Sequence, residues 1–115
     1  MASSVTDSPS SSPRLVVELL YFDGCPNYRP LAARLRQLLD QSGVDADLRE
    51  LRVDSDDAAI EQKFLGSPTV RVEGVDVDPA GEIRHNYGLS CRLYRTPEGL
   101  LGTPPDEWIT AALKR

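Results

Sequence analysis

The stretch Leu15-Val-Val-Glu-Leu-Leu-Tyr-Phe-Asp-Gly-Cys-Pro-Asn-Tyr28 decides the fold. Its first eight residues are almost entirely apolar and rich in β-branched and aromatic side chains. Such a run is typical of a strand that is buried on both faces of a sheet. Asp23-Gly24 ends this strand, and four leucines between positions 31 and 39 then recur at helical spacing. The pattern predicts a central strand, a short loop that carries Cys25, and a helix.

The rest of the chain predicts further strands and helices in alternation. Asp54 or Ser55 can cap a second helix, whose apolar stripe we expect at Ile60, Phe64 and Leu65. Alternating strands and helices imply parallel pairing through a crossover, and later strands can add in antiparallel fashion. We therefore expect an α/β fold in the order β-α-β-α-β-β-α, with a central mixed sheet flanked by helices. The expected strands are 15–22, 46–53, 69–73 and 91–94, and the expected helices are 31–42, 55–65 and 104–113.

Composition and charge limit the classes of partner. The chain has 115 residues, 40% of them hydrophobic and 27% charged, as in an ordinary soluble domain. Its formal net charge of −5 argues against nucleic acid or an anionic membrane, because binding phosphates requires a concentrated positive surface. No apolar run approaches the roughly 20 residues of a membrane span, and a secretory signal is not apparent, so we expect a cytoplasmic protein. Residues 1–13, with six serines and two prolines, predict a disordered tail before a single domain at 14–115.

Cys25 is the first candidate for chemistry. It follows the carboxyl end of the first strand and precedes a helix, which is where reactive groups tend to lie in α/β sheets. Unpaired N–H groups and the helix dipole favour the thiolate, which is the form that attacks disulfides or binds soft metals. Arg29 is near enough in sequence to help, whereas the carboxylate of Asp23 would oppose it. The alternative is that Cys25 is a small buried residue that only fills space.

The segment Gly66-Ser67-Pro68-Thr69 lies between the second predicted helix and the next strand. A proline directly before a strand is a candidate for a cis peptide, which costs only about 0.5–1 kcal/mol at an X-Pro bond. Taken by itself, the segment is better interpreted as an ordinary trans proline at the start of a strand.

Together these features resemble the thioredoxin-like superfamily over nearly all of residues 14–115. Cys25-Pro26-Asn27-Tyr28 is similar to the glutaredoxin motif Cys-Pro-Tyr-Cys, with Tyr28 where the second cysteine would be. Pro68 matches the cis-proline that packs beside the reactive cysteine in relatives. The resemblance implies monothiol chemistry at Cys25 with a low-molecular-weight or protein thiol as partner. It also implies that the backbone of Ser67 offers strand-like hydrogen bonds to that substrate, within a binding site made of Pro26, Tyr28, Ser67, Pro68 and Thr69.

Cys91, in Gly88-Leu-Ser-Cys-Arg-Leu-Tyr94, has three open roles. It could resolve an adduct on Cys25, share one soft metal ion with Cys25, or point into the core as a buried strand cysteine. The patterns around Cys25, Pro68 and Cys91 are also similar to small bacterial thioredoxin-like proteins, some of which carry an alkylmercury-lyase label. Organomercurial lyases use two cysteines and an aspartate, and Cys25, Cys91 and Asp23 supply those residue types.

The favoured function is therefore that of a thiol-redox protein, a candidate thiol-disulfide oxidoreductase, acting through Cys25 with Cys91 as a candidate resolving thiol. One alternative is a soft-metal or organomercurial-handling protein that uses both cysteines. Another is a non-catalytic thioredoxin-like binding module. We expect no bound cofactor and no resident metal, because the only histidine, His85, fits a solvated loop residue and no phosphate-cradling glycine loop is present.

Overall fold

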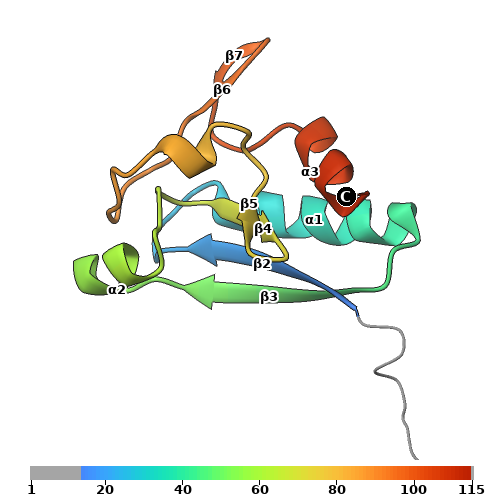
Figure 1. The fold of residues 1–115 in the computed structure, drawn as a ribbon, viewed down its shortest axis with the longest axis horizontal. Coiled ribbons are helices and arrows are strands. Elements are labelled where there is room, and N and C mark those ends of the chain that lie inside the picture. Colours follow the sequence, from blue (N-terminus) through green and yellow to red (C-terminus); the bar gives the residue numbers. More distant parts are fainter. Residues whose placement is uncertain (1–13, 115) are drawn as a thin grey trace, which may run out of the picture.

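A computed structural model describes residues 14–114, except the side chain of Glu82. The tail predicted for residues 1–13 lies outside the described residues. Among residues 14–114, no helix combines the length and the apolar character that crossing a membrane requires. In chain order (Figure 1) the elements are β2 (Leu15–Tyr21), α1 (Tyr28–Ser42), β3 (Ala46–Arg52), α2 (Asp56–Glu61), β4 (Thr69–Val72), β5 (Val75–Asp76), the 3₁₀ helix η2 (Gly81–Ile83), β6 (Tyr94–Thr96), β7 (Gly99–Leu101) and α3 (Asp106–Leu113).

Four of the strands form one mixed sheet in the order β3-β2-β4-β5. β2 pairs in parallel with β3, from Leu15 opposite Ala46 to Tyr21 opposite Arg52, and it pairs antiparallel with β4 on its other edge. The turn between β4 and β5 is Glu73-Gly74, and both residues have the positive φ that a type I′ hairpin turn requires. The mixed sheet and its helices confirm the predicted α/β class, with 15–22 as a central strand.

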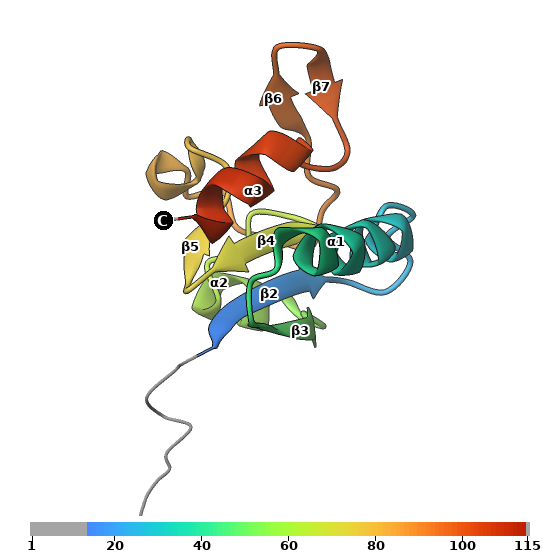
Figure 2. The same ribbon diagram turned by 90° about the vertical axis from the view of Figure 1, so that its right-hand side faces the viewer.

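Helices cover both faces of this sheet (Figure 2). α1 and α3 pack on one face, where Leu19 of β2 joins the same core as Leu35 and Ile109. On the other face, Leu20 joins a smaller core with Ala59 of α2. Neighbouring residues of a strand point to opposite faces, so a strand covered on both faces is apolar throughout rather than alternating. Burial of one such leucine contributes roughly 1.5–3 kcal/mol to stability.

The second helix is shorter than predicted. Ser55 caps it as expected, because its side-chain oxygen accepts a hydrogen bond from Ala58 N–H at 3.0 Å. The helix then ends at Glu61, since Lys63 adopts a left-handed backbone with φ of 54° and turns the chain away. Phe64 N–H bonds to Ala59 C=O at 2.8 Å, which completes a Schellman-type end. The predicted apolar stripe is therefore wrong at Ile60, which is 59% exposed, while Phe64 is buried beyond the helix end.

The strand predicted at 91–94 is also different in the structure. β6 begins only at Tyr94 and pairs with β7 in a separate hairpin that projects beyond the main sheet (Figures 1 and 2). Cys91 forms a single isolated bridge with Ser67 instead. The segment nevertheless shows an alternation in burial, because Arg92 and Tyr94 are buried while Cys91 and Leu93 are exposed. It arises from two anchored side chains rather than from a strand ladder.

Candidate thiol site

Cys25 lies in a tight turn between the carboxyl end of β2 and the start of α1. Its N–H donates to Phe22 C=O at 3.3 Å, and its own C=O accepts from Tyr28 N–H at 3.4 Å. Gly24, with φ of 88°, provides the positive φ that this reversal needs. α1 begins at Tyr28, with Asn27 as its N-cap residue, so the loop delivers Cys25 to the amino end of this helix as the sequence predicts.

Cys25 is one of the residues that line a hollow of about 460 Å³, which we call the thiol hollow. Cys25 is 8% exposed, so the thiol is mostly covered but borders open space. A volume of this size lies within the usual range of small-molecule pockets, about 300–1,000 Å³. All of its lining residues come from one continuous segment: Tyr21, Phe22, Asp23, Gly24, Cys25, Pro26, Tyr28 and Arg29.

Tyr28 forms a fixed wall of the thiol hollow. Its ring stacks on Tyr21 with 3.7 Å between centroids and 3° between planes. Its hydroxyl donates to Glu50, whose other carboxylate oxygen pairs with Arg36. The hydrogen bond to Glu50, followed by burial, raises the pKa of Tyr28 well above its ordinary value. An ordinary tyrosine is already neutral near pH 7, and Tyr28 contributes a flat surface rather than a second thiol.

The two charged residues of the loop are placed differently. The Asp23 carboxylate pairs with Arg52 at 3.1 Å, and both side chains are largely exposed. This pairing offsets the negative charge that was expected to oppose a thiolate at Cys25. Arg29 lines the thiol hollow and is exposed, and no ion pair is recorded for it with any residue in the described part of the chain. Arg29 is therefore available to an anionic ligand.

Ser67 connects the Cys25 loop to the segment that carries Cys91. The Ser67–Pro68 peptide is cis, as the resemblance implied. The Ser67 hydroxyl oxygen accepts from Phe22 N–H at 3.4 Å. Its backbone N–H donates to Ser90 C=O at 2.8 Å, and its C=O accepts from Arg92 N–H at 3.0 Å. The backbone of Ser67 is thus already paired within the chain, which differs from the prediction that it is free for a substrate.

Pro68 and Thr69 are interior residues as well. The C=O of Pro68 accepts from the buried Tyr94 hydroxyl. The Thr69 hydroxyl donates to Gly66 C=O at 2.6 Å and accepts from Arg92 Nη1 at 2.9 Å. Of the predicted substrate-binding residues, only Pro26 and Tyr28 line the thiol hollow. Ser67, Pro68 and Thr69 are buried and do not line it.

Cys91 is exposed, so the interpretation of it as a buried strand cysteine is wrong. Its segment and the Cys25 loop both bond to Ser67, which brings two free thiols to the same end of the sheet. No group of three or more His, Cys, Asp or Glu side chains within the described residues could hold a metal ion. Asp23, Cys25 and Cys91 therefore do not form such a group.

Arg92 holds the Cys91 segment in place, and the sequence analysis missed it. Its side chain is fully buried and donates to Asp76 at 2.7 and 3.2 Å and to Asp78 at 3.3 Å. The guanidinium carbon also lies 4.4 Å from the centroid of the Tyr94 ring. The sequence carries no signal for this role, because a buried charge is rare and the acidic partners of Arg92 lie 16 and 14 positions away.

Comparison of the chain with models of protein families, with curated proteins and with solved structures finds no match.

Proposed function

We propose that this protein is a monothiol redox protein of the thioredoxin-like kind, in which Cys25 is the attacking group. The observation that carries the proposal is the position of Cys25, in the wall of a hollow between the carboxyl end of β2 and the start of α1. Two further features support it. One is the strand order β3-β2-β4-β5, with parallel and antiparallel neighbours around β2, and the other is the cis Ser67–Pro68 peptide beside the Cys25 loop.

The first step of the proposed reaction is attack by the Cys25 thiolate on one sulfur of a substrate disulfide. A new bond forms between Cys25 Sγ and that sulfur, while the substrate S–S bond breaks and the other half leaves as a thiolate that takes a proton from water. An external thiol then attacks the substrate sulfur of the mixed disulfide, and Cys25 leaves as the thiolate. The protein is unchanged after both steps, because the electrons come from the external thiol. The cytoplasm, which we predict as the compartment, would supply such a thiol.

Cys91 is the candidate second thiol in an alternative second step. Its thiolate would attack Cys25 Sγ, release the bound half of the substrate as a thiolate, and leave a disulfide between Cys25 and Cys91. The protein would then have lost two electrons and would need reduction by a thiol of the cell. The shared hydrogen bonds to Ser67 support this role, because they hold both cysteine segments to one residue.

The thiol hollow favours a small substrate with an acidic group. Its wall combines the stacked Tyr21 and Tyr28 rings with the exposed guanidinium of Arg29, while Asp23 is paired to Arg52. A low-molecular-weight thiol that carries a carboxylate fits this combination of a flat apolar wall and one cation. Cleavage of carbon–mercury bonds needs two thiolates and an acid in one place, and no observation favours it here.

The test is adduct formation with glutathione disulfide as the probe at pH 7, followed by intact and peptide mass spectrometry. We expect one glutathione adduct on Cys25 in the unaltered chain, and the same adduct, more persistent, in Cys91→Ser. Cys25→Ser is the matched control and should form adducts at least about tenfold more slowly. Equal rates of adduct formation in Cys25→Ser and in the unaltered chain would contradict the proposal and favour a binding module with an inert Cys25.

A further inference from the structure

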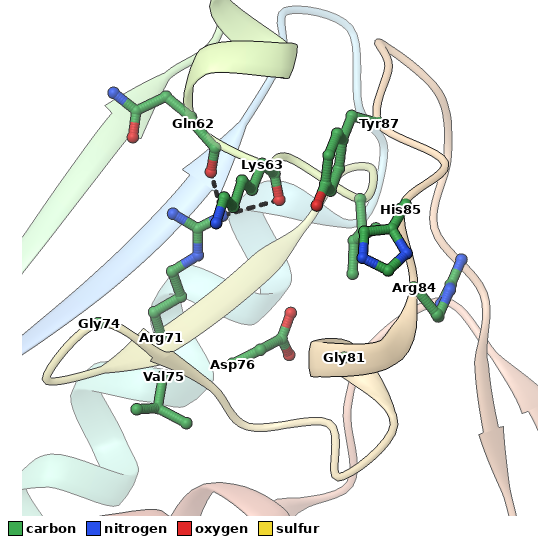
Figure 3. A pocket seen from close by; sticks show the side chains of 11 residues that line it. Gln62, Lys63, Arg71, Gly74, Val75, Asp76, Gly81, Arg84, His85 and Tyr87 are labelled. Atoms are coloured by element: carbon green, nitrogen blue, oxygen red, sulfur yellow. Dashed lines mark hydrogen bonds between the residues drawn. The ribbon is translucent and has the colours of Figure 1, made fainter.

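A second hollow, of about 420 Å³, lies on the face of the sheet that α2 covers (Figure 3). Three segments build it: the end of α2, the β4–β5 hairpin, and the stretch from Gly81 to Tyr87. It shares no lining residue with the thiol hollow. We call it the basic hollow, defined by Lys63, Arg71, Arg84, His85 and Tyr87 together with Asp76.

Positive groups outnumber negative ones among the lining residues. Lys63, Arg71 and Arg84 each come from a different segment, while Asp76 is the one carboxylate among the described lining side chains. The whole chain carries a formal net charge of −5, whereas the side chains that line the basic hollow are positive on balance. A concave surface lined by one sign of charge attracts ions of the opposite sign.

The carboxylate of Asp76 is already satisfied from the inside of the protein. Buried Arg92 donates to both of its oxygens, at 2.7 and 3.2 Å. The oxygen at 3.2 Å also accepts from Asp78 N–H at 2.9 Å. This ion pair weakens the negative field of Asp76 in the hollow, although Arg92 is shared with Asp78. Three positive side chains, Lys63, Arg71 and Arg84, still line the hollow against this one carboxylate.

Arg71 is held at the wall in a fixed orientation. Its Nη2 donates to the backbone oxygens of Gln62 and Lys63 at 2.5 and 3.0 Å, drawn as dashed lines in Figure 3. Within residues 14–114, no acceptor is recorded for its Nε or Nη1. Burial lowers the pKa of Arg71 despite the nearby carboxylates of Asp76 and Glu18, although an arginine stays protonated in any case. The guanidinium of Arg71 is therefore partly removed from water, and its Nε–H and Nη1–H groups are available to a ligand.

His85 and Tyr87 add further hydrogen-bonding groups to the lining of the hollow. Figure 3 shows Tyr87 and His85 across the hollow from Arg71, with Asp76 between the two sides. The two rings meet edge to face with 6.2 Å between centroids, which keeps them in one arrangement. Arg84 extends away from the centre of the hollow in the same view. It therefore adds positive charge near a bound anion without contacting it.

We propose that the basic hollow binds a small oxyanion, the phosphate or carboxylate group of a small molecule, with Arg71 as its main contact. Because Arg71 Nη2 already bonds to two carbonyls, the Nε–H and Nη1–H groups are the ones that can each donate to an oxygen of such a group. A hydrogen bond from a charged donor to an oxyanion is roughly twice as strong as one between neutral groups. Lys63 supplies a second positive charge, and the Tyr87 hydroxyl supplies a neutral hydrogen bond. The site is independent of the thiol chemistry proposed for Cys25.

The test uses inorganic phosphate and succinate as separate probes on the full chain at low ionic strength, with sodium chloride of equal ionic strength as the reference. Binding is followed by ¹H–¹⁵N NMR. We expect saturable shifts at the Arg71 Nε–H and at the amides of Lys63, His85 and Tyr87 for at least one probe. A response to phosphate alone or to succinate alone identifies which source of the oxyanion fits.

Variants decide whether the effect is local. Arg71→Gln should weaken binding about tenfold or more, because it removes a charged hydrogen-bonding partner. Arg84→Gln is the matched control, since it removes the same charge from a side chain that points away, and it should weaken binding less than about threefold. If Arg71→Gln does not fold, Lys63→Gln combined with Tyr87→Phe takes its place. Equal losses in the test and control variants, or shifts that never saturate, would overturn the site in favour of a diffuse ionic effect.

Discussion

The thiol hollow and the basic hollow differ in how the chain builds them. The thiol hollow is made from one continuous segment, Tyr21 to Arg29, at the junction of a strand and a helix. The basic hollow is assembled from three segments that span Gln62 to Tyr87, and it depends on Arg92 behind it. The thiol hollow needs only neighbouring residues of one loop and its flanking elements. The basic hollow forms only when three segments that are separate in the sequence pack together. We therefore expect the two hollows to respond differently when the packing around Arg92 is weakened.

The largest expected effect is that of Arg92→Met. The change leaves Asp76 and Asp78 buried without their cation, and breaking a buried ion pair in this way costs about 3–5 kcal/mol. Urea unfolding measures the loss. Anion binding in the basic hollow should also disappear, because Asp76 would then present its charge to the hollow, while reaction at Cys25 should persist in the folded fraction.

Arg95→Met is the matched control for Arg92→Met. Arg95 is exposed on β6, so removing it should change the free energy of unfolding by no more than about 0.5 kcal/mol. A loss below about 1 kcal/mol in Arg92→Met would mean that the ion pairs of Arg92 with Asp76 and Asp78 do not stabilise the fold.

A smaller effect is expected at Gly66, where the Cys91 segment approaches closely. A Cβ added there would lie 2.9 Å from Ser90 C=O and 3.0 Å from Arg92 Cβ, at a φ of 124°. Gly66→Ala should therefore cost roughly 2–3 kcal/mol from strain and collision. Gly24 has a φ of 88° but open space around it. We therefore expect Gly24→Ala to lower the free energy of unfolding by only about 1 kcal/mol. Equal losses in thermal or urea unfolding would show that the Ser90–Arg92 contact is not tight.

The smallest effect is expected for Tyr28→Phe in the thiol hollow. The variant keeps the ring stacked on Tyr21 and loses the hydrogen bond to Glu50, at a cost of about 1 kcal/mol near pH 7. In the folded protein the pKa of Tyr28 is raised above the unfolded value near 10. The contribution of Tyr28 to the free energy of unfolding is therefore fully present below pH 10 and is lost as the pH rises beyond that value.

The pH dependence separates Tyr28 from a second tyrosine. Burial raises the pKa of Tyr94 as well, so the unaltered chain loses stability above pH 10 through both groups. Urea unfolding between pH 8 and 11 should show a shallower decline for Tyr28→Phe, with the part due to Tyr94 remaining. An identical decline in both proteins would mean that the hydrogen bond of Tyr28 with Glu50 does not form.

Sequence reasoning works where a structure depends on neighbouring residues. The buried strand before Cys25, the Ser55 cap and the end of α1 at Gly43 all follow from local patterns. It fails at Lys63, because a left-handed residue other than glycine leaves no signal in composition. It also fails at Ser67, whose hydrogen bonds to Ser90 and Arg92 join it to a segment that is distant in the sequence. Long-range pairs of this kind are decided by packing, which one sequence does not display.

The central claim, that Cys25 is the reactive thiol, is tested most directly by the relative alkylation rates of Cys25 and Cys91 with iodoacetamide. Both are followed by peptide mass spectrometry, in the native protein and in urea. In urea the two should react alike. In the native protein Cys25 is 8% exposed and Cys91 is exposed, so accessibility alone favours Cys91. The account predicts that Cys25 nevertheless reacts faster, because it proposes Cys25 as the attacking thiol of the protein. Protection of Cys25 with rapid reaction of Cys91 would contradict it.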